Sequence, residues 1–298
     1  MGRYPRIDRD LVRGLYDEHR NVTRVHELLV ERGIACSYGT IRSIISGKAD
    51  SAKGRKTRSR FAEEPVDNRL AKMPAINNPA LAEMRTLYPH TVVRDLTNVT
   101  MLKSGEHQKK IGGKVLKGKW AGFPVYCLTL EERVTCPVSC RHIRSCYGNQ
   151  MNWAHRHDHR APEFEWKLAR EVVELGRRHP NGFVVRLHIL GDFFSVRYVH
   201  LWEALLDQVP ALHVYGYTAR WGDEIASALM SISVNRWARF AIRFSNAPMP
   251  ARATVTIEHP MQRPANAFIC PVQLGRTESC ATCAACWSTK KNVAFVQH

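Results

Sequence analysis

The chain has 298 residues, 44% hydrophobic and 24% charged, which suits a large folded domain and excludes a wholly disordered chain. Lys and Arg outnumber Asp and Glu by 44 to 27, and the net charge of +17 favours a nucleic-acid partner over a merely solvated basic surface. No apolar run approaches the ~20 residues of a membrane helix, and the opening MGRYPRIDRD does not read as a secretory signal. We therefore expect a cytoplasmic protein with no membrane partner. In that compartment its nine cysteines favour metal ligation over disulfides.

Residues 1–47 predict a small domain of three short helices. Apolar residues recur at helical spacing, Asp8 and Asn21 are suitable N-caps for the first two helices, and Gly33 ends the second. The positions expected to be buried are Leu11, Val12, Leu15, Val22, Val25, Leu28, Leu29, Ile41, Ile44 and Ile45.

The third helix begins at Ser37 or Thr40 and ends at Gly47. The order helix, short turn, helix ending in TIRSIISGK resembles a helix-turn-helix of the resolvase and transposase type, whose last helix enters the major groove of DNA. The alternative is a three-helix bundle that only packs on the rest of the protein. The polar residues expected to face DNA are Tyr38, Thr40, Arg42 and Ser43.

Residues 48–72 predict a basic flexible linker, because cationic residues alternate there with small and polar ones. Beside a helix-turn-helix, such an arm follows the phosphate backbone or the minor groove; the alternative is a solvated spacer. Its cations are Lys48, Lys53, Arg55, Lys56, Arg58 and Arg60.

Residues 73–298 predict an α/β domain. The basic, glycine-rich stretch 101–120 suggests a loop or hairpin that touches phosphate or serves as a surface flap. Strands that alternate with helices of ten or more residues imply parallel pairing, so we expect a partial or complete TIM-like barrel, with a doubly wound sheet as the alternative. Strands are expected at 123–129, 183–189, 212–218, 239–245 and 253–259, and helices at 196–209 and 222–232.

Two cysteine groups carry the strongest chemical signal. The first lies in TCPVSCRHIRSCYG, after a predicted strand, and the second in ICPVQLGRTESCATCAACW, whose closely spaced cysteines and one remote cysteine suit the loop that wraps a four-iron cube. The first group has only three thiols, so it shares the second group's cluster or holds a cube with one open iron. The predicted ligands are Cys136, Cys140, Cys146, Cys270, Cys280, Cys283 and Cys286.

Several alternatives stay open at these cysteines. Zinc is the alternative metal at Cys270, Cys280, Cys283 and Cys286, because four thiolates also satisfy a tetrahedral zinc ion. Cys127 is either a fourth ligand of the first group or a buried apolar thiol, and Cys36 is expected to be structural.

Polar side chains also lie near the ends of the predicted strands, where parallel α/β folds place their sites. A charge that points into a barrel has to be paired or functional, and the non-functional alternative is an internal ion pair of Arg186 with Asp192. The His-rich run HRHDHR (155–160) is expected to be a solvated helical face rather than a metal site. The pocket candidates are Arg186, His188, Asp192, Tyr217 and Arg243.

These stretches resemble the phage gene-product-88-like family over about residues 95–298. The resemblance rests on GKWAGFPVYCLTLEERVTCPVSCRHIRSCYGN, RLHILGDFFSVRYVHLW, YGYTAR and CATCAACW, and it implies a phage or mobile-element context. The domain is also similar in outline to radical S-adenosylmethionine enzymes, which have a parallel barrel and three cysteines after the first strand. Their Cys-x3-Cys-x2-Cys spacing differs from the gaps of three and five residues here, which puts S-adenosylmethionine as a cofactor in doubt.

Two functions follow as hypotheses. The first is a DNA-binding iron–sulfur protein that regulates transcription, carries one or two [4Fe-4S] clusters and dimerises on double-stranded DNA, since helix-turn-helix units usually work in pairs. The second is a radical-type iron–sulfur enzyme that acts on nucleic acid. The residues alone leave open whether the barrel is catalytic.

Overall fold

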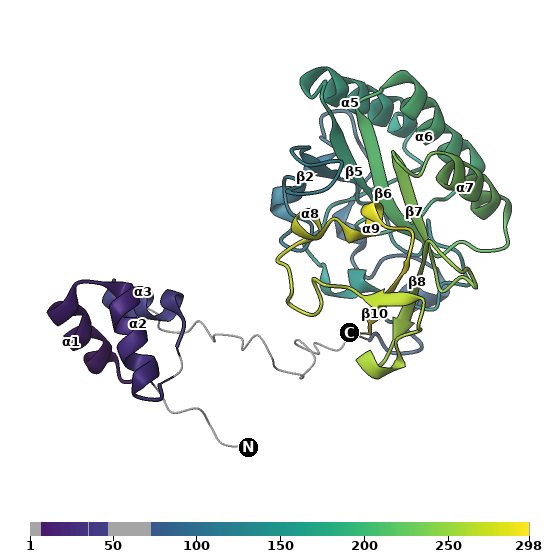
Figure 1. Ribbon diagram of the computed structural model, residues 1–298. Coiled ribbons are helices and arrows are strands. Elements are labelled where there is room, and N and C mark those ends of the chain that lie inside the picture. The colour runs from purple at the N-terminus through teal and green to yellow at the C-terminus, as the bar shows by residue number, and fades with distance from the viewer. Residues whose placement is uncertain (1–6, 35, 47–72, 298) are drawn as a thin grey trace. The chain divides into compact units, whose positions relative to one another are not determined.

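The computed structural model describes residues 7–34, 36–46 and 73–297. The chain divides into two compact units, Met1–Ala62 and Glu63–His298, drawn in Figure 1. Gly47 and the predicted linker lie outside the described residues. The linker cations that therefore have no structural description are Lys48, Lys53, Arg55, Lys56, Arg58 and Arg60.

The smaller unit consists of the helices α1 (Arg9–His19), α2 (Val22–Glu31) and α3 (Tyr38–Ile45). The side chains of Asp8, Asn21 and Ser37 each accept backbone N–H groups in the first turn of these helices, so the first two predicted N-caps are confirmed and Ser37, not Thr40, caps the third. Gly33 follows α2 with a φ of +72°, a conformation that favours glycine and ends the helix as expected.

The apolar faces of α1, α2 and α3 pack against one another. The fully buried members are Val12, Leu15, Val25, Leu29, Ile41 and Ile44, all predicted to be buried. On α3 the polar side chains Tyr38, Thr40 and Arg42 are exposed and Ser43 is half-buried. Tyr38 stacks on His26 of α2 with ring centroids 4.3 Å apart, so α3 is fixed on its neighbour by an aromatic contact as well as by its core.

The larger unit contains an eight-stranded, mostly parallel sheet. Its spatial order is β2-β3-β5-β6-β7-β8-β10-β9, in which only the pairing of β2 with β3 is antiparallel. The strands are β2 (Lys103–Ser104), β3 (Val125–Cys127), β5 (Phe183–Leu187), β6 (Leu212–Thr218), β7 (Phe240–Ser245), β8 (Ala253–Ile257), β9 (Ala267–Ile269) and β10 (Asn292–Val296).

The strand order decides between the expected sheet types. From β3 to β8 the strands follow one another in chain order, without the central reversal of a doubly wound sheet. The described residues leave β2 and β9 as two edges, so a complete, closed barrel is not formed among them. The chain is therefore a mixed α/β protein with an N-terminal helical unit.

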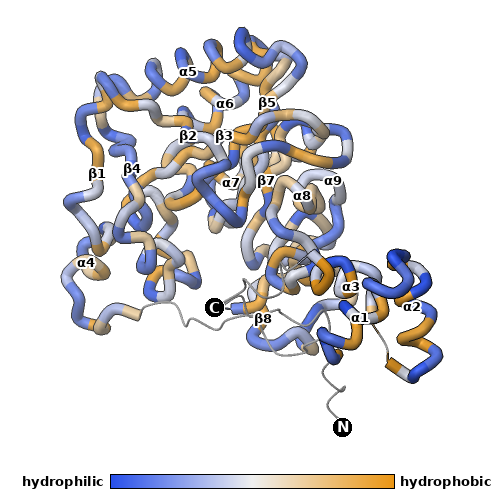
Figure 2. The backbone as a smooth tube through the Cα atoms, turned by 90° about the vertical axis from the view of Figure 1, so that its left-hand side faces the viewer, coloured by the Kyte–Doolittle hydropathy of each residue, from blue (hydrophilic) through white to orange (hydrophobic). Residues whose placement is uncertain are grey.

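Three helices pack side by side along one side of this sheet, α5 (Phe164–Arg178), α6 (Val196–Gln208) and α7 (Glu224–Asn235) (Figure 1). They bury the main apolar core against the strands, and in Figure 2 hydrophobic and hydrophilic turns alternate along α5. A second, smaller core lies around Tyr215, Trp120 and Trp287. The indole rings of Trp120 and Trp287 stack with their centroids 5.2 Å apart. The sheet thus has one face covered by long helices and another that is closed by cysteine-bearing loops.

The run 155–160 differs from its prediction as a solvated helical face. It forms β4 (Arg156–His157), a parallel partner of β1 (Val92–Val93), and Arg156, His157 and Asp158 are buried. Arg156 is tolerated there because a carboxylate from a distant segment accepts its hydrogen bonds, which a local reading of helical spacing does not detect.

The remaining elements are short and lie mainly in the connections. Among the described residues no helix is both long and apolar enough to cross a membrane. These elements are α4 (Pro79–Ala82), α8 (Cys280–Cys283), α9 (Ala285–Ser288) and the 3₁₀ turns Pro89–Thr91, Gly105–His107, Tyr147–Gln150 and Pro260–Gln262.

Candidate metal centre

A cavity of about 610 Å³ lies at the carboxyl ends of the parallel strands. Residues at or after the ends of β5, β6 and β7 contribute to its wall, among them Arg186, Thr218 and Ser245. This is the edge at which parallel α/β folds place their sites, because the loops that follow successive strands meet there.

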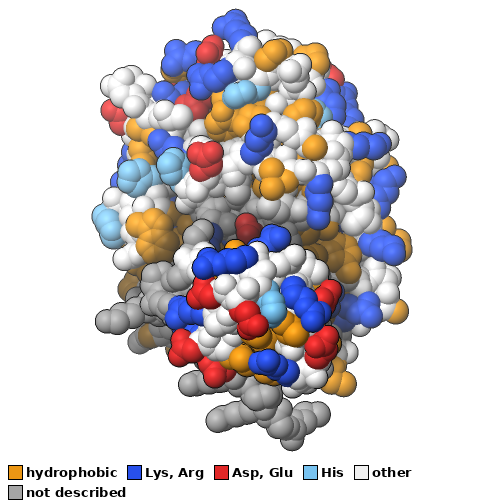
Figure 3. Space-filling model, turned by 60° about the vertical axis from the view of Figure 1, so that its left-hand side comes forward, with side chains coloured by type: hydrophobic (Ala, Val, Ile, Leu, Met, Phe, Trp, Pro, Cys, Tyr) orange, Lys and Arg blue, Asp and Glu red, His pale blue; other side chains and the backbone are white. Residues whose placement is uncertain are grey.

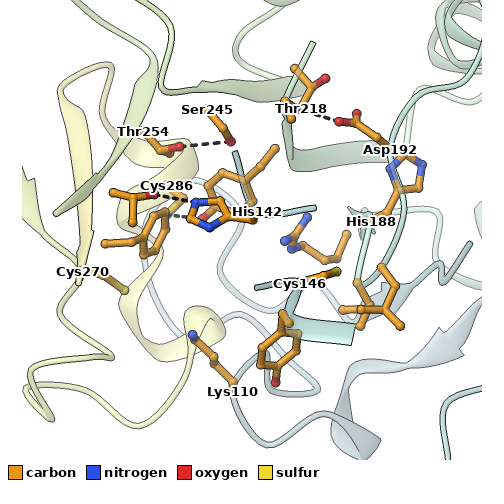
Figure 4. A pocket seen from close by; sticks show the side chains of 18 of the residues that line it. Lys110, His142, Cys146, His188, Asp192, Thr218, Ser245, Thr254, Cys270 and Cys286 are labelled. Atoms are coloured by element: carbon orange, nitrogen blue, oxygen red, sulfur yellow. Dashed lines mark hydrogen bonds between the residues drawn. The ribbon is translucent and has the colours of Figure 1, made fainter. Parts of the chain in front are cut away.

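All seven predicted ligand cysteines line this one cavity. Figure 4 shows Cys270 and Cys286 on one side of it, His188 and Asp192 on the opposite side, and Cys146 between them. The complete set is Cys136, Cys140, Cys146, Cys270, Cys280, Cys283 and Cys286. The structure therefore brings together two cysteine groups that are far apart in the sequence.

The first cysteine loop is closed by the buried side chain of Arg133. Its Nε donates to the Ile143 carbonyl over 2.9 Å, and its two other nitrogens donate to the Arg85 carbonyl and to Asn149 Oδ1. The backbone N–H groups of Arg133 and Gly148 each lie 3.4 Å from a cysteine sulfur, those of Cys136 and Cys146 respectively. One guanidinium thus joins the beginning and the end of the loop that carries the first three thiols.

A second set of bonds fixes the residue before Cys136. The Asp192 backbone N–H donates to Thr135 Oγ1 over 3.1 Å, and Arg220 donates to the Thr135 carbonyl over 3.1 Å. The Asp192 carboxylate accepts the N–H groups of Phe193 and Ala219, each over 2.7 Å. Burial raises the pKa of Asp192 to about 6, against the lowering effect of these hydrogen bonds. The loops after β5 and β6 therefore position the first cysteine group.

Three cysteines of the second group lie on α8 and α9, two single helical turns, and Cys270 directly follows β9. Ser279 caps α8 in a capping box with Thr282, and Ala284, with a φ of +59°, turns the chain from one helix to the next. Backbone N–H groups of α8 donate to the carbonyls of Lys110 and Ile111 over 2.8 Å, so the basic stretch 101–120 lies against this helix instead of forming a free flap.

Arg243 anchors the end of this second loop. Its guanidinium is fully buried and donates to the carbonyls of Cys286, Thr289 and Lys291. Of the five pocket candidates, Arg243 is the one that does not line the cavity. Its three bonds make it a structural anchor for Cys286.

Within each group, burial and the neighbouring thiols raise the pKa of the cysteines. Burial first, and then the charge of Cys286, raises the pKa of Cys280, which reaches about 12, and of Cys270. In the first group burial, followed by Asp192 and by the neighbouring cysteines, raises the pKa of Cys136. A raised pKa favours the protonated thiol. Metal ligation would favour the thiolate instead, because a coordinating thiol is deprotonated.

The two other cysteines do not line the cavity. Cys127 is buried in the core beside Trp120, and burial raises its pKa to about 12, as expected of an apolar thiol. Cys36 is half-buried in the helical unit and contacts its core. The alternative of Cys127 as the fourth ligand of the first group is therefore not favoured.

Four of the pocket candidates, Arg186, His188, Asp192 and Tyr217, do line the cavity. The Arg186 guanidinium lies over the ring of Tyr217, 4.6 Å from its centroid, and the described residues show no ion pair between Arg186 and Asp192. His188 is buried, and its Nε2 lies 3.0 Å from the Tyr198 hydroxyl.

Several site residues were missed by the sequence reading. His142 lines the cavity and hydrogen-bonds with Ser145 and with Thr256 on β8 (Figure 4). Lys110, which belongs to the predicted basic stretch 101–120, lines the cavity as well. Arg133 and Arg156 donate hydrogen bonds to backbone carbonyls of the first loop, those of Ile143 and Gly148. His142 lies inside the first cysteine loop, which was a usable signal, whereas the role of the arginines depends on partners that are distant in the sequence.

The positive charge is not confined to the helical unit. Figure 3 shows Lys and Arg side chains spread over one face of the larger unit. Among the described residues, no group of three or more His, Cys, Asp or Glu side chains has the geometry to hold a metal ion.

The family model described as Gene product 88 matches residues 100–289, which agrees with the resemblance seen in the cysteine motifs. No curated protein and no solved structure matches the chain. The matched segment covers more than half of the chain and includes all seven cavity cysteines. The chain therefore belongs to the gene product 88 family.

Proposed function

We propose that this chain is a DNA-binding iron–sulfur protein, and that its cavity is the active site of an iron–sulfur enzyme acting on nucleic acid. The observation that carries the proposal is the convergence of seven cysteines on one cavity that also contains Arg186, Asp192 and Tyr217. Its volume of about 610 Å³ falls within the range of about 300–1,000 Å³ typical of ligand sites. A simple redox sensor does not require such a space.

The donor set suits iron–sulfur clusters. Thiolates are the usual ligands of [4Fe-4S] clusters, and the four cysteines of the second group match the ligand number of one cube. The first group would hold a second cube through Cys136, Cys140 and Cys146. When bound, a reduced cluster supplies single electrons. Zinc in the second group remains the competing occupant.

The chain's own residues would bind and orient a substrate. Arg186 projects a cation into the cavity beside two aromatic rings and can bind an anionic group, such as a phosphate of a nucleic acid. The buried Asp192, whose pKa is raised to about 6, is suited to exchange a proton near neutral pH. The partial TIM-like barrel belongs to the same proposal: consecutive parallel strands with α5, α6 and α7 on one side are the arrangement from which such barrels are built.

A transcriptional regulator is the second candidate, and the helical unit favours it. The exposed polar residues of α3 would serve as the base- and phosphate-contacting residues of a recognition helix. In this case the cluster would sense iron or redox state. The expected partner, double-stranded DNA, is common to both candidates, as is a homodimer.

Anaerobic purification followed by an absorption spectrum and by iron and sulfide counts tests the cofactor. A brown protein with bound sulfide supports the proposal, and a colourless protein that contains zinc contradicts it. Anaerobic reduction with S-adenosylmethionine then tests the enzyme: formation of 5′-deoxyadenosine supports radical chemistry, and no product at full cluster occupancy argues against it. If binding of a specific DNA sequence instead depends on the cluster, the regulator is favoured.

A further inference from the structure

One hydrogen bond directly connects the strand ends with a cysteine sulfur. The Tyr217 hydroxyl, at the end of β6, donates to Cys286 Sγ over 2.9 Å. A tyrosine hydroxyl is protonated at neutral pH and can donate. Tyr217 is therefore a permanent donor to one sulfur of the second cysteine group.

Cations accompany this donor. Arg186 lies over the Tyr217 ring at 4.6 Å, and its buried Nε has no hydrogen-bond partner among the described residues. Arg186 lines the cavity together with the four thiols of the second group. Lys110 also lines the cavity beside Cys270 (Figure 4).

The first group has backbone donors instead. The N–H groups of Arg133 and Gly148 lie 3.4 Å from the sulfurs of Cys136 and Cys146. The Glu132 carboxylate near this group is paired with Arg156. Substitution of the Tyr217 hydroxyl therefore removes a donor to the second group and none of these donors to the first.

We propose that Tyr217 and Arg186 tune the reduction potential of the cluster held by Cys270, Cys280, Cys283 and Cys286. The inference rests on the proposed iron–sulfur function. Reduction adds one negative charge to a cluster, and much of that charge resides on its sulfurs. Hydroxyl donors and cations stabilise the added charge and raise the reduction potential, whereas nearby carboxylates lower it.

Redox titration of the full anaerobic protein, followed by electron paramagnetic resonance, tests this assignment. Cys140→Ala and Cys280→Ala proteins, which each retain one group intact, identify the two signals. In Tyr217→Phe the second signal should lose about tenfold in its ratio of reduced to oxidised cluster at a fixed potential, equivalent to about 59 mV for one electron. The first signal should not move. Tyr126→Phe is the matched control, because the Tyr126 hydroxyl bonds His179 outside the cavity.

Arg186→Gln provides a second variant, whose second signal should shift in the same direction as that of Tyr217→Phe. Full iron content with an unchanged potential in both variants would overturn the inference while leaving the iron–sulfur function intact. A protein without iron or sulfide would instead refute the proposed function itself.

Discussion

Arg156 and Glu132 form a fully buried ion pair beneath the first cysteine loop. Arg156 Nε lies 2.6 Å from Glu132 Oε2, and a second nitrogen lies 3.0 Å from Oε1. The remaining guanidinium donors bond Thr91 and the carbonyls of Met151, Ala154 and Gly148. The pair therefore ties β4, the first cysteine loop and the segment before β1 together.

Removing one charge of this pair should destabilise the larger unit. Glu132→Gln leaves Arg156 buried without a compensating carboxylate, and breaking such a pair typically costs about 3–5 kcal/mol. The free energy of unfolding in urea measures the effect. Glu174→Gln, in an exposed helical pair with Arg177 and Arg178, is the control and should change little. Equal effects of the two substitutions would show that burial of the Glu132 pair does not matter.

The iron content should divide between the two cysteine groups. Cys280→Ala should lose the iron and sulfide of the second group and keep those of the first, and Cys140→Ala should do the reverse. Cys127→Ala, which removes a buried thiol outside the cavity, should keep the full wild-type content. Iron and sulfide counts on anaerobic protein decide the question. Total loss in either variant would instead indicate one cluster shared between the groups.

Arg133 should be needed for the first group alone. Arg133→Lys retains the charge but cannot reproduce three hydrogen bonds with its single ammonium group, so the loop should lose its closed form. We expect about half of the iron to be lost when both groups are occupied, measured as above. Arg236→Lys, at an exposed pair with Asp207, should leave the iron content unchanged. Retention of all iron by Arg133→Lys would contradict the anchoring role.

The exposed side of α3 should bind DNA. Arg42→Ala should weaken binding by about 1–3 kcal/mol if Arg42 contacts a base, or reduce the salt slope by about one charge if it contacts phosphate. Fluorescence anisotropy at several salt concentrations measures both quantities. Arg32→Ala removes the same charge from the exposed C-terminal end of α2. Identical losses in the two variants would show that only net charge is involved.

Acid should destabilise the fold through buried histidines. Burial, aided by Lys103, lowers the pKa of His157 to about 4, whereas an unfolded histidine titrates near 6.5. Between these values the unfolded chain binds the proton and the folded chain does not, so stability falls as the pH falls through this window and is unaffected above it.

The titration of His157 should lower the free energy of unfolding by as much as about 3 kcal/mol between pH 7 and pH 4. His157→Gln, which keeps an N–H donor without a titratable group, should flatten this loss in urea unfolding experiments at both pH values. Some loss should persist, because burial also lowers the pKa of His188. An unchanged pH dependence in His157→Gln would exclude His157 as its source.

Much of the secondary structure could be predicted because its signals are local. The strand expected at 212–218 is β6 with the same bounds, and the N-caps Asp8 and Asn21 were correct, since a cap depends on a few neighbouring residues. The run 155–160 was wrong for the opposite reason: its burial depends on Glu132 from another segment. The helix α5, whose residues follow that run, was also not predicted from the sequence.

The sequence by itself determined which residues can ligate a metal, because thiol chemistry and short-range spacing are properties of the chain. Only the tertiary structure decided that Cys136 and Cys286 line the same cavity, and that Arg186 and Tyr217 belong to the wall of the second group while Asp192 belongs to that of the first. The physical reason is the parallel sheet. Its crossovers bring the carboxyl ends of distant strands to one edge, and the order of those strands, absent from any local pattern, sets which charges lie beside which thiols.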